Sequence, residues 1–317
     1  MQTQQHEVLE GISNWLRDDA DCWLCAVVAT IGSSPRPVGS LAALHRDGRQ
    51  IGSLSGGCIE EDLARRLLDG EYDSHAPQRV EYGVTAEENE RLGLPCGGRL
   101  TLLVQRLQRS DQTWLDEALR ALRERQCIER HVDLASGSTH IQRVAAFTPL
   151  QLNGKTLRQC FGPQMRMLLV GAGQLAQSVA ELALAMDYEV IVTDPREEVL
   201  RQWSGPDVRR LSGMPDDVAS AHAADAQSVV ITLTHDPRID DMALMQALET
   251  DAWYVGALGS ERATKKRLLR LRELGVSETN LARLHAPVGL PIGSKTPVEI
   301  AVAIMAQLTQ LRRSRTL

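Results

Sequence analysis

The chain has 317 residues, a length for which two domains of about 150 residues each are expected. Apolar residues make up 43% of the sequence and charged residues 24%, the balance of a globular protein that can bury a core. The net charge of −6 argues against nucleic acid or a membrane surface as the main partner, and six cysteines are too few for a disulfide scaffold. The first residues lack a basic segment followed by an apolar stretch, which predicts a cytoplasmic protein.

The first half of the chain predicts an α+β domain. It begins with an amphipathic helix, in which Val8, Ile12 and Leu16 recur at the spacing of one helical face. An Asp47-Gly48 pair predicts a tight turn between two strands. In chain order, strands are expected at residues 23–31, 40–45, 51–54, 78–82 and 100–107, helices at residues 59–68 and 114–126, and a hairpin at residues 127–134 and 140–148.

From Met165 onward, short apolar runs alternate with helical patterns. Such alternation is typical of a parallel sheet built from βαβ units. We therefore expect an α/β protein, with an N-terminal α+β domain at residues 1–162 and a Rossmann-like parallel-sheet domain at residues 163–317. In the second domain, strands are expected at residues 167–170, 189–193, 228–233 and 253–257, with helices between them and at residues 261–274 and 297–311.

The first strand of this second domain is followed by a G-x-G-x-x-A turn and a helix. Gly171 allows the tight turn, Gly173 lets the backbone approach a phosphate, and Ala176 lets the helix pack closely on the strand. Asp194 ends the next strand, near the spacing at which an acidic side chain accepts from a ribose diol. Arg196 could meet a second phosphate or extend into solvent. The alternative for the glycines is that the strand–helix corner itself needs them, with another phosphate ligand or none.

Two cysteines of the first domain lie beside glycine pairs. Cys58 follows Gly56-Gly57 at the start of a predicted helix, whose N-terminus favours the thiolate and its affinity for sulfur or a metal. Cys96 precedes Gly97-Gly98 in a loop where the backbone can approach a ligand closely. Both are candidate metal ligands. The alternative for each is a small buried side chain in a tight turn.

Arg36 lies between Pro35 and Pro37, in the loop after the first strand. Because the prolines stiffen this loop, the guanidinium is suited to hold a phosphate or a carboxylate. The alternative is an exposed arginine in a proline turn. In the second domain, ligands are expected at the carboxyl ends of the parallel strands. The loops expected at that edge are residues 234–236, 256–260 and 291–296.

Taken together, these motifs resemble those of the XdhC/CoxI family, over nearly the whole chain. The segments that carry the resemblance are residues 32–39, 55–60 and 96–98 in the first half, and residues 171–176, 193–196, 234–236, 256–260 and 285–296 in the second.

The resemblance implies an accessory protein of molybdenum hydroxylases such as xanthine dehydrogenase, a maturation factor rather than an enzyme. Such a protein binds molybdenum cofactor, a molybdopterin that is sometimes extended to a dinucleotide. It keeps the cofactor while a sulfido ligand is installed and passes it to the apoenzyme. The implied partners are the molybdenum hydroxylase apoenzyme and, as a second candidate, a cysteine desulfurase. A homodimer is included because a transient carrier often presents two symmetric patches.

In this interpretation, Cys58 lies nearest the molybdenum or the transferred sulfur, Cys96 is second, and no residue has a catalytic role. Soft thiolates and a phosphate-binding loop suit such a ligand. Two rivals stay open: an NAD(P)-dependent oxidoreductase that uses the Rossmann domain, and a docking scaffold with a vestigial pocket. The candidate cofactor-binding residues are Arg36, Cys58, Cys96, Gly171, Gly173, Asp194 and Arg196.

Overall fold

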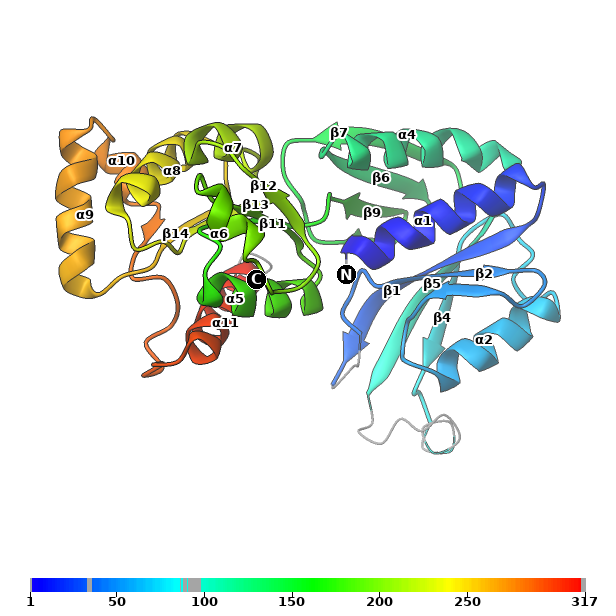
Figure 1. Cartoon of the computed structure of the whole chain (residues 1–317). Helices are drawn as coiled ribbons and strands as arrows, with labels where there is room; N and C mark the ends of the chain where they lie inside the picture. Colours follow the sequence, from blue (N-terminus) through cyan, green and yellow to red (C-terminus); the bar gives the residue numbers. More distant parts are fainter. Residues whose placement is uncertain (1, 33–35, 86, 88–89, 91–97, 315–317) are drawn as a thin grey trace. The chain divides into compact units, whose positions relative to one another are not determined.

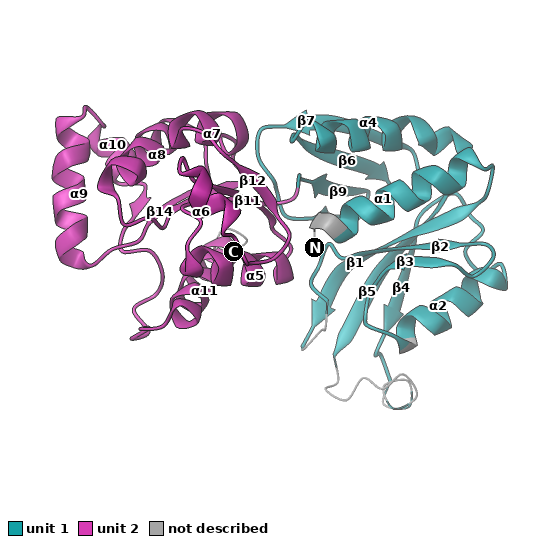
Figure 2. Cartoon of the chain, in the orientation of Figure 1, with its two compact units in different colours: residues 1–163 teal, residues 164–317 magenta. Residues whose placement is uncertain are grey.

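The computed structural model describes residues 2–32, 36–85, 87, 90 and 98–314, without the side chains of residues 2, 3 and 58 (Figure 1). The chain divides into two compact units, residues 1–163 and residues 164–317 (Figure 2). Within the described ranges, every helix is too short or too polar to cross a bilayer.

The first unit combines two antiparallel sheets with helices. In chain order, its elements are α1 (Gln2–Arg17), β1 (Cys22–Ile31), β2 (Leu41–His45), β3 (Gln50–Gly52), α2 (Cys58–Leu68), β4 (Gln78–Tyr82), β5 (Arg99–Leu107), the 3-10 helix η1 (Arg109–Asp111), α4 (Gln112–Arg123), β6 (Cys127–Asp133), β7 (Thr139–Val144), β8 (Gln151–Leu152) and β9 (Thr156–Phe161). The strand order is β3-β2-β1-β5-β4 in the larger sheet and β7-β6-β9-β8 in the smaller one.

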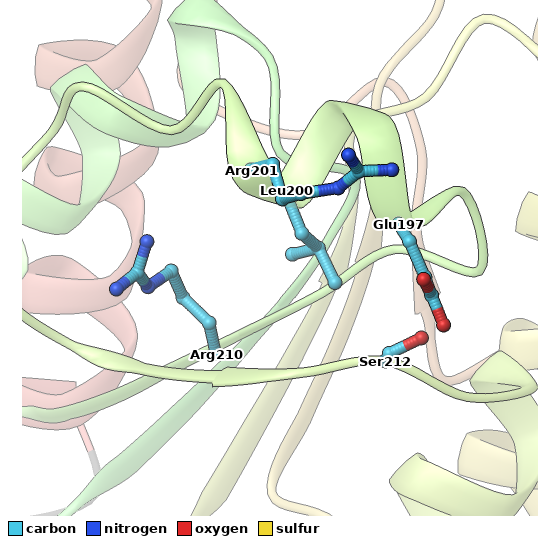
Figure 3. A pocket seen from close by; sticks show the side chains of 5 residues that line it. All are labelled: Glu197, Leu200, Arg201, Arg210 and Ser212. Carbon is cyan, nitrogen blue, oxygen red and sulfur yellow. The ribbon is translucent and has the colours of Figure 1, made fainter.

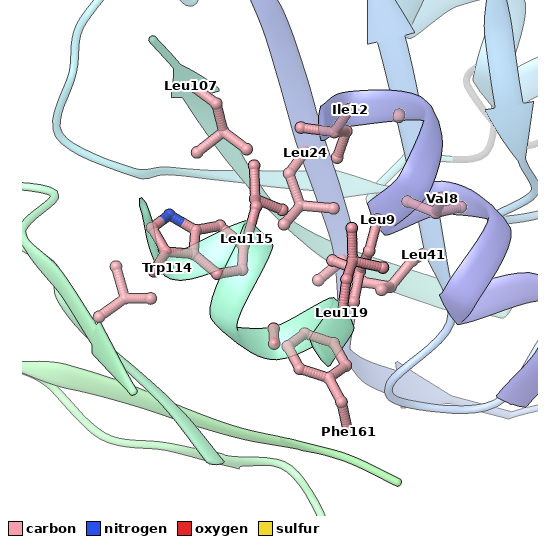
Figure 4. Close-up of a cluster of buried hydrophobic side chains, with 14 of the residues drawn as sticks. Val8, Leu9, Ile12, Leu24, Leu41, Leu107, Trp114, Leu115, Leu119 and Phe161 are labelled. Carbon is pink, nitrogen blue, oxygen red and sulfur yellow. The ribbon is translucent and has the colours of Figure 1, made fainter. Parts of the chain in front are cut away.

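The larger sheet is buried on both faces, because successive residues of its central strand β1 point to opposite sides. Cys22 and Leu24 join a core formed with α1, α4 and the smaller sheet, whereas Trp23 and Cys25 join a core formed with α2. Figure 4 shows the first of these cores, with Trp114 of α4 among its side chains. Although Cys22 and Cys25 have the C-x-x-C spacing, their thiols therefore lie on opposite faces. Burial raises the pKa of Cys22 to about 12.

The pattern of the sequence did not predict β8 and β9. Strand β9 lies directly before the expected domain boundary and pairs with β6, so that Phe161 is opposite Ile128. Its residues Leu157, Cys160 and Phe161 are buried, and this spacing is not the period of two that identifies a strand from sequence. Pairing with β6, rather than local pattern, places β9 in the sheet.

The second unit is a parallel sheet with helices on both faces. In chain order, its elements are β10 (Arg166–Val170), α5 (Gln174–Ala185), β11 (Glu189–Thr193), α6 (Glu197–Arg201), β12 (Arg209–Leu211), α7 (Pro215–His222), β13 (Ser228–Thr232), α8 (Pro237–Glu249), β14 (Tyr254–Ala257), α9 (Glu261–Glu273), α10 (Glu278–Leu281), β15 (Leu284–His285) and α11 (Pro297–Ser314). The strand order is β12-β11-β10-β13-β14-β15, with every pair parallel.

This strand order reverses direction beside β10, as in doubly wound nucleotide-binding sheets. Residues of α5, α6 and α11 pack in one core, and residues of α7, α8, α9 and α10 pack in the core on the other face. The mixed architecture confirms the predicted fold class. The short β12, α7, α10 and β15 were not predicted, because two to eight residues carry too little periodicity.

Candidate functional site

The loop between β10 and α5 crosses the carboxyl edge of the parallel sheet. Gly171 has a φ of 109°, and a methyl group on its Cα would lie 2.8 Å from Cγ2 of Thr234, so only glycine fits there. Gly173 is the N-cap of α5, and a methyl group on its Cα would meet no described atom within 4 Å. Packing inside the unit thus explains Gly171, whereas the space beside Gly173 is open to a ligand.

Asp194, directly after β11, is fully buried and is engaged by donors of its own chain. Its carboxylate accepts from the peptide N–H groups of Ala172, at 3.2 Å, and Arg196, at 3.0 Å. It also pairs with Nε and Nη2 of Arg196, each at 2.8 Å. Burial raises the pKa of Asp194, but hydrogen bonds from Arg196 and Ala172 outweigh this effect and lower it.

The structure gives Asp194 a different task from the ribose contact that its spacing suggests. Both carboxylate oxygens accept hydrogen bonds from the chain itself, and the side chain has no exposed surface. Asp194 instead orients the guanidinium of Arg196, whose side chain is 50% exposed, and holds the glycine loop through Ala172. Any contribution of Asp194 to ligand binding is therefore indirect.

A buried ionic network holds the loop after β13. The hydroxyl of Thr234 donates to Asp240 at 2.7 Å, and Nη2 of Arg267 donates to the same carboxylate at 2.9 Å. Nη1 of Arg267 donates to the carbonyl of Leu258, directly after β14, at 3.0 Å. Burial raises the pKa of Asp240, and the Thr234 hydroxyl and Arg267 oppose this shift. The network ties together the loops that follow β13 and β14.

A hollow lies between α6 and β12 (Figure 3). Its lining residues are Glu197, Leu200 and Arg201 of α6, Arg210 of β12 and Ser212 after that strand. Two guanidinium groups and one carboxylate give this hollow mixed charge. Because α6 begins directly after Arg196, the hollow adjoins the segment that carries that guanidinium.

In the first unit, the segments that the sequence singled out lie at one end of the larger sheet. Antiparallel pairing of Ile31 with Arg99 and of Gly52 with Ala42 shows that β1 and β3 end where β5 begins. Strand β4 also ends there, because it runs antiparallel to β5. The connections that follow β1, β3 and β4 therefore leave the sheet at the same end.

The carboxylate of Glu60 organises the segment between β3 and α2. It accepts hydrogen bonds of 2.8–3.0 Å from the peptide N–H groups of Leu54, Ser55, Gly56 and Gly57. The hydroxyls of Ser53 and Ser55 donate to it as well. Glu60 is only 4% exposed. Burial raises its pKa, but the hydrogen bonds from the loop lower it to about 2.

Of the first unit's predicted site residues, Arg36 lies in the connection after β1 and is partly buried. Cys58 is the first residue of α2, directly after the loop held by Glu60, and its side chain lies outside what the structure describes. Cys96 lies outside the described residues. The topology thus brings the segments that carry Arg36 and Cys58 to one end of the sheet, and their roles stay predictions.

Comparison with known proteins identifies the family. Residues 167–308 match the family described as XdhC Rossmann domain, and residues 15–83 match the XdhC and CoxI family. A protein of Escherichia coli (strain K12), described as molybdenum cofactor insertion chaperone PaoD, is 30% identical over 290 residues, which are 91% of this chain and 83% of that protein. This chain belongs to the XdhC and CoxI family. The predicted resemblance is confirmed.

Two further proteins resemble this member of the XdhC and CoxI family along nearly their whole length. A protein of Bacillus subtilis (strain 168), described as a probable subunit of xanthine dehydrogenase, is 25% identical over 332 residues and is covered to 97%, as is this chain. A crystal structure described as a xanthine dehydrogenase from Bacillus halodurans superimposes with a TM-score of 0.73 at 24% identity, covering 98% of this chain and 96% of that one. The second comparison establishes that the two chains share a fold.

Sequence reasoning did not single out Glu60 in this XdhC and CoxI protein. A signal was present, because a glutamate three residues after a helix N-cap can reach back to free N–H groups. Glu60 stands at that position relative to Gly57. The spacing alone suggests an ordinary helix cap, whereas the structure shows that the carboxylate gathers the whole loop that precedes Cys58.

Proposed function

We propose that this chain is an accessory protein that binds molybdenum cofactor as its cargo. In this role it protects the cofactor during sulfuration and delivers it to a xanthine dehydrogenase-type molybdenum hydroxylase. The main support is the 30% identity to the chaperone PaoD, which extends over 83% of that protein. The donor groups in the two units are chemically suited to such a cargo, which combines phosphate with sulfur-bound molybdenum.

The Rossmann unit offers groups for the anionic part of the cargo. The N-terminus of α5 carries unpaired N–H groups and a partial positive charge, which favour a phosphate. Gly173 leaves open space at that N-terminus, and the Arg196 guanidinium is oriented by Asp194 at the same edge of the sheet. In our proposal, Gly171, Gly173 and Arg196 hold the phosphate, and Asp194 acts through Arg196 and Ala172.

The first unit offers groups for the metal-bearing part. A thiolate is the soft ligand that suits sulfur-bound molybdenum, and the first turn of a helix stabilises a thiolate. Cys58 begins α2 behind a loop that Glu60 holds in one conformation. We assign Cys58 to the molybdenum or the transferred sulfur, with Cys96 as the second thiol and Arg36 as an anion ligand.

A specific observation favours a second candidate, an NAD(P)-dependent oxidoreductase. The strand order of the second unit is that of dinucleotide-binding domains. The engagement of Asp194 weighs against NAD, because the carboxylate that would accept from the ribose diol is buried and already binds Arg196 and Ala172. Titration with NADH and NADPH separates the two functions: stoichiometric binding with turnover would favour the oxidoreductase.

The decisive experiment is to purify the full chain anaerobically from molybdate-supplied cells and to measure molybdenum and pterin in the same sample. Our proposal predicts both in equal amounts, and protein without pterin would contradict it and favour a docking scaffold. Cys58→Ala should lower the retained molybdenum and the activation of the target hydroxylase. Cys160→Ala is the matched control, because Cys160 lies in β9 of the smaller sheet. Equal retention in both variants would remove Cys58 from the site.

The same proposal includes the protein's partners. We infer that the chain docks transiently on the hydroxylase apoenzyme in the cytoplasm, and that a cysteine desulfurase supplies the sulfur. We also infer a homodimer. Light scattering after size-exclusion chromatography measures the mass of the assembly, and pull-down with purified apoenzyme and desulfurase tests the two contacts. A monomer that captures neither protein would contradict these inferences.

A further inference from the structure

The tripeptide Asp-Pro-Arg occurs twice in the second unit, at residues 194–196 and 236–238. In both copies, Oδ1 of the aspartate accepts from the peptide N–H of the arginine at 3.0 Å. In both copies, the aspartate also pairs with Nε and Nη2 of the arginine, at 2.8 and 2.8 Å for Arg196 and at 3.1 and 2.8 Å for Arg238. The two copies are therefore the same local device, which we call the Asp-Pro-Arg clamp.

The two clamps lie on either side of the glycine loop. Strands β11 and β13 both pair with β10, and the register places Thr193 and Thr232 level with Val170, the residue before Gly171. The first clamp follows Thr193 directly, and the second lies in the loop after Thr232. They are also close enough to interact, because the Asp236 carboxylate adds to the effect of Asp194 in raising the pKa of Arg196.

Each clamp aims a guanidinium without using all of its donors. A guanidinium has five N–H donors in a planar fork. The aspartate takes the donor on Nε and one on Nη2, so Nη1 and the second Nη2 hydrogen lie outside the ion pair. The helix starts need only the aspartate and the peptide N–H groups. The arginine side chains are thus spare for another partner, and they are 50% exposed for Arg196 and 88% exposed for Arg238.

We propose that Arg196 and Arg238 form a two-guanidinium cradle across the Gly171–Gly173 loop for a ligand with two linked phosphates. A single phosphate at the N-terminus of α5 would leave at least one of the flanking guanidinium groups unused, whereas a diphosphate has oxygens for both. The inference rests on the proposed function in one respect: it names the cargo as the nucleotide-extended form of the cofactor, whose pterin and nucleotide are joined by a diphosphate. The clamp that contains Arg238 adds a binding residue to the site.

Isothermal titration calorimetry of the full chain with inorganic diphosphate and inorganic phosphate tests the cradle. The wild type should bind diphosphate at least about tenfold more tightly than phosphate, since one charge-assisted hydrogen bond accounts for roughly that factor. Arg196→Gln and Arg238→Gln should each lose about tenfold in diphosphate affinity. Arg272→Gln is the matched control, because Arg272 pairs with Glu278 through the same Nε and Nη2 atoms but lies on α9. It should bind like the wild type.

Because Arg238 is largely exposed, R238Q tests the cradle without disturbing the core, and thermal unfolding verifies the fold of R196Q. Equal diphosphate affinity in R238Q, R272Q and the wild type would overturn the cradle, as would a wild type that does not prefer diphosphate to phosphate. The proposed function has its own readout, the pterin content of the anaerobically purified wild type. Nucleotide released from that pterin by a pyrophosphatase supports the diphosphate form, and pterin without nucleotide overturns it while leaving the carrier function intact.

Discussion

Replacing Glu60 by glutamine should loosen the loop before Cys58 and lower the stability of the protein. The carboxylate receives four peptide N–H groups and two hydroxyls, and all of these donors lie between residues 53 and 57. The neutral amide of glutamine has one acceptor oxygen instead of two and adds an N–H₂ group that faces other donors. Buried N–H groups of the loop would then lose their partners, which destabilises the folded state.

The size of the effect follows from the pKa of Glu60, which is lowered from 4.5 to about 2 in the folded protein. One pKa unit corresponds to about 1.4 kcal/mol, so the lowered pKa contributes roughly 3 kcal/mol to the free energy of unfolding. Because the folded pKa is lowered, this contribution is fully present above about pH 4.5 and is lost as the pH falls toward 2. Roughly 1 kcal/mol should remain at pH 3.

Urea unfolding of the wild type and Glu60→Gln at pH 7, 5 and 3 measures this contribution. The difference between the two proteins should be roughly 3 kcal/mol at pH 7 and should shrink toward pH 3. Glu61→Gln makes the same chemical change on the exposed neighbouring residue and should cost less than about 0.5 kcal/mol. If E60Q unfolds like E61Q at pH 7, or if its deficit is the same at every pH, then Glu60 does not organise this loop through its charge.

Three further substitutions test the carboxyl edge of the parallel sheet. Gly171→Ala should lower the free energy of unfolding by roughly 2 kcal/mol, since it combines a φ of 109° with a contact of 2.8 Å to Thr234. Gly173→Ala should unfold like the wild type but bind inorganic diphosphate more weakly in calorimetry, because its methyl group enters open space at the start of α5. Asp240→Ala should cost roughly 3 kcal/mol in urea unfolding, because it leaves the buried Arg267 without its closest carboxylate.

The two glycine variants control each other. Equal losses of stability in G171A and G173A would contradict the assignment of one glycine to packing and the other to ligand approach. For Asp240, the exposed Asp207→Ala in the same unit is the reference. A D240A protein as stable as D207A would show that the network joining the loops after β13 and β14 is not important for folding.

Local pattern carried much of the fold. The helix with Val8 and Ile12, the turn at Asp47-Gly48 and the strand–glycine–helix segment at Gly171 are each determined by residues near one another in the chain. The period of the apolar residues and the special conformations of glycine act over a few residues, so they can be recognised without tertiary information. The alternation of strands and helices in the second half predicted the parallel sheet for the same reason.

The candidate site depended more on long-range contacts. Sequence spacing put Asp194 near a ribose, but the fold surrounds its carboxylate with N–H groups from Ala172 and Arg196 and removes it from solvent. Spacing also marked Glu60 as no more than a helix cap. The number of donors that reach its carboxylate depends on the path of the whole segment after β3, and a pattern of residue types does not encode that path.

The sequence by itself determined the kind of protein: two units of different texture, a Rossmann-like second half, and motifs that identify the XdhC and CoxI family. Only the tertiary structure decided which charged side chains are engaged and which are presented. The pairing of β11 and β13 with β10 brings two Asp-Pro-Arg clamps, about 40 residues apart in the chain, to the two sides of one glycine loop. Hydrogen bonding between strands sets that arrangement, because register joins residues that are distant in sequence.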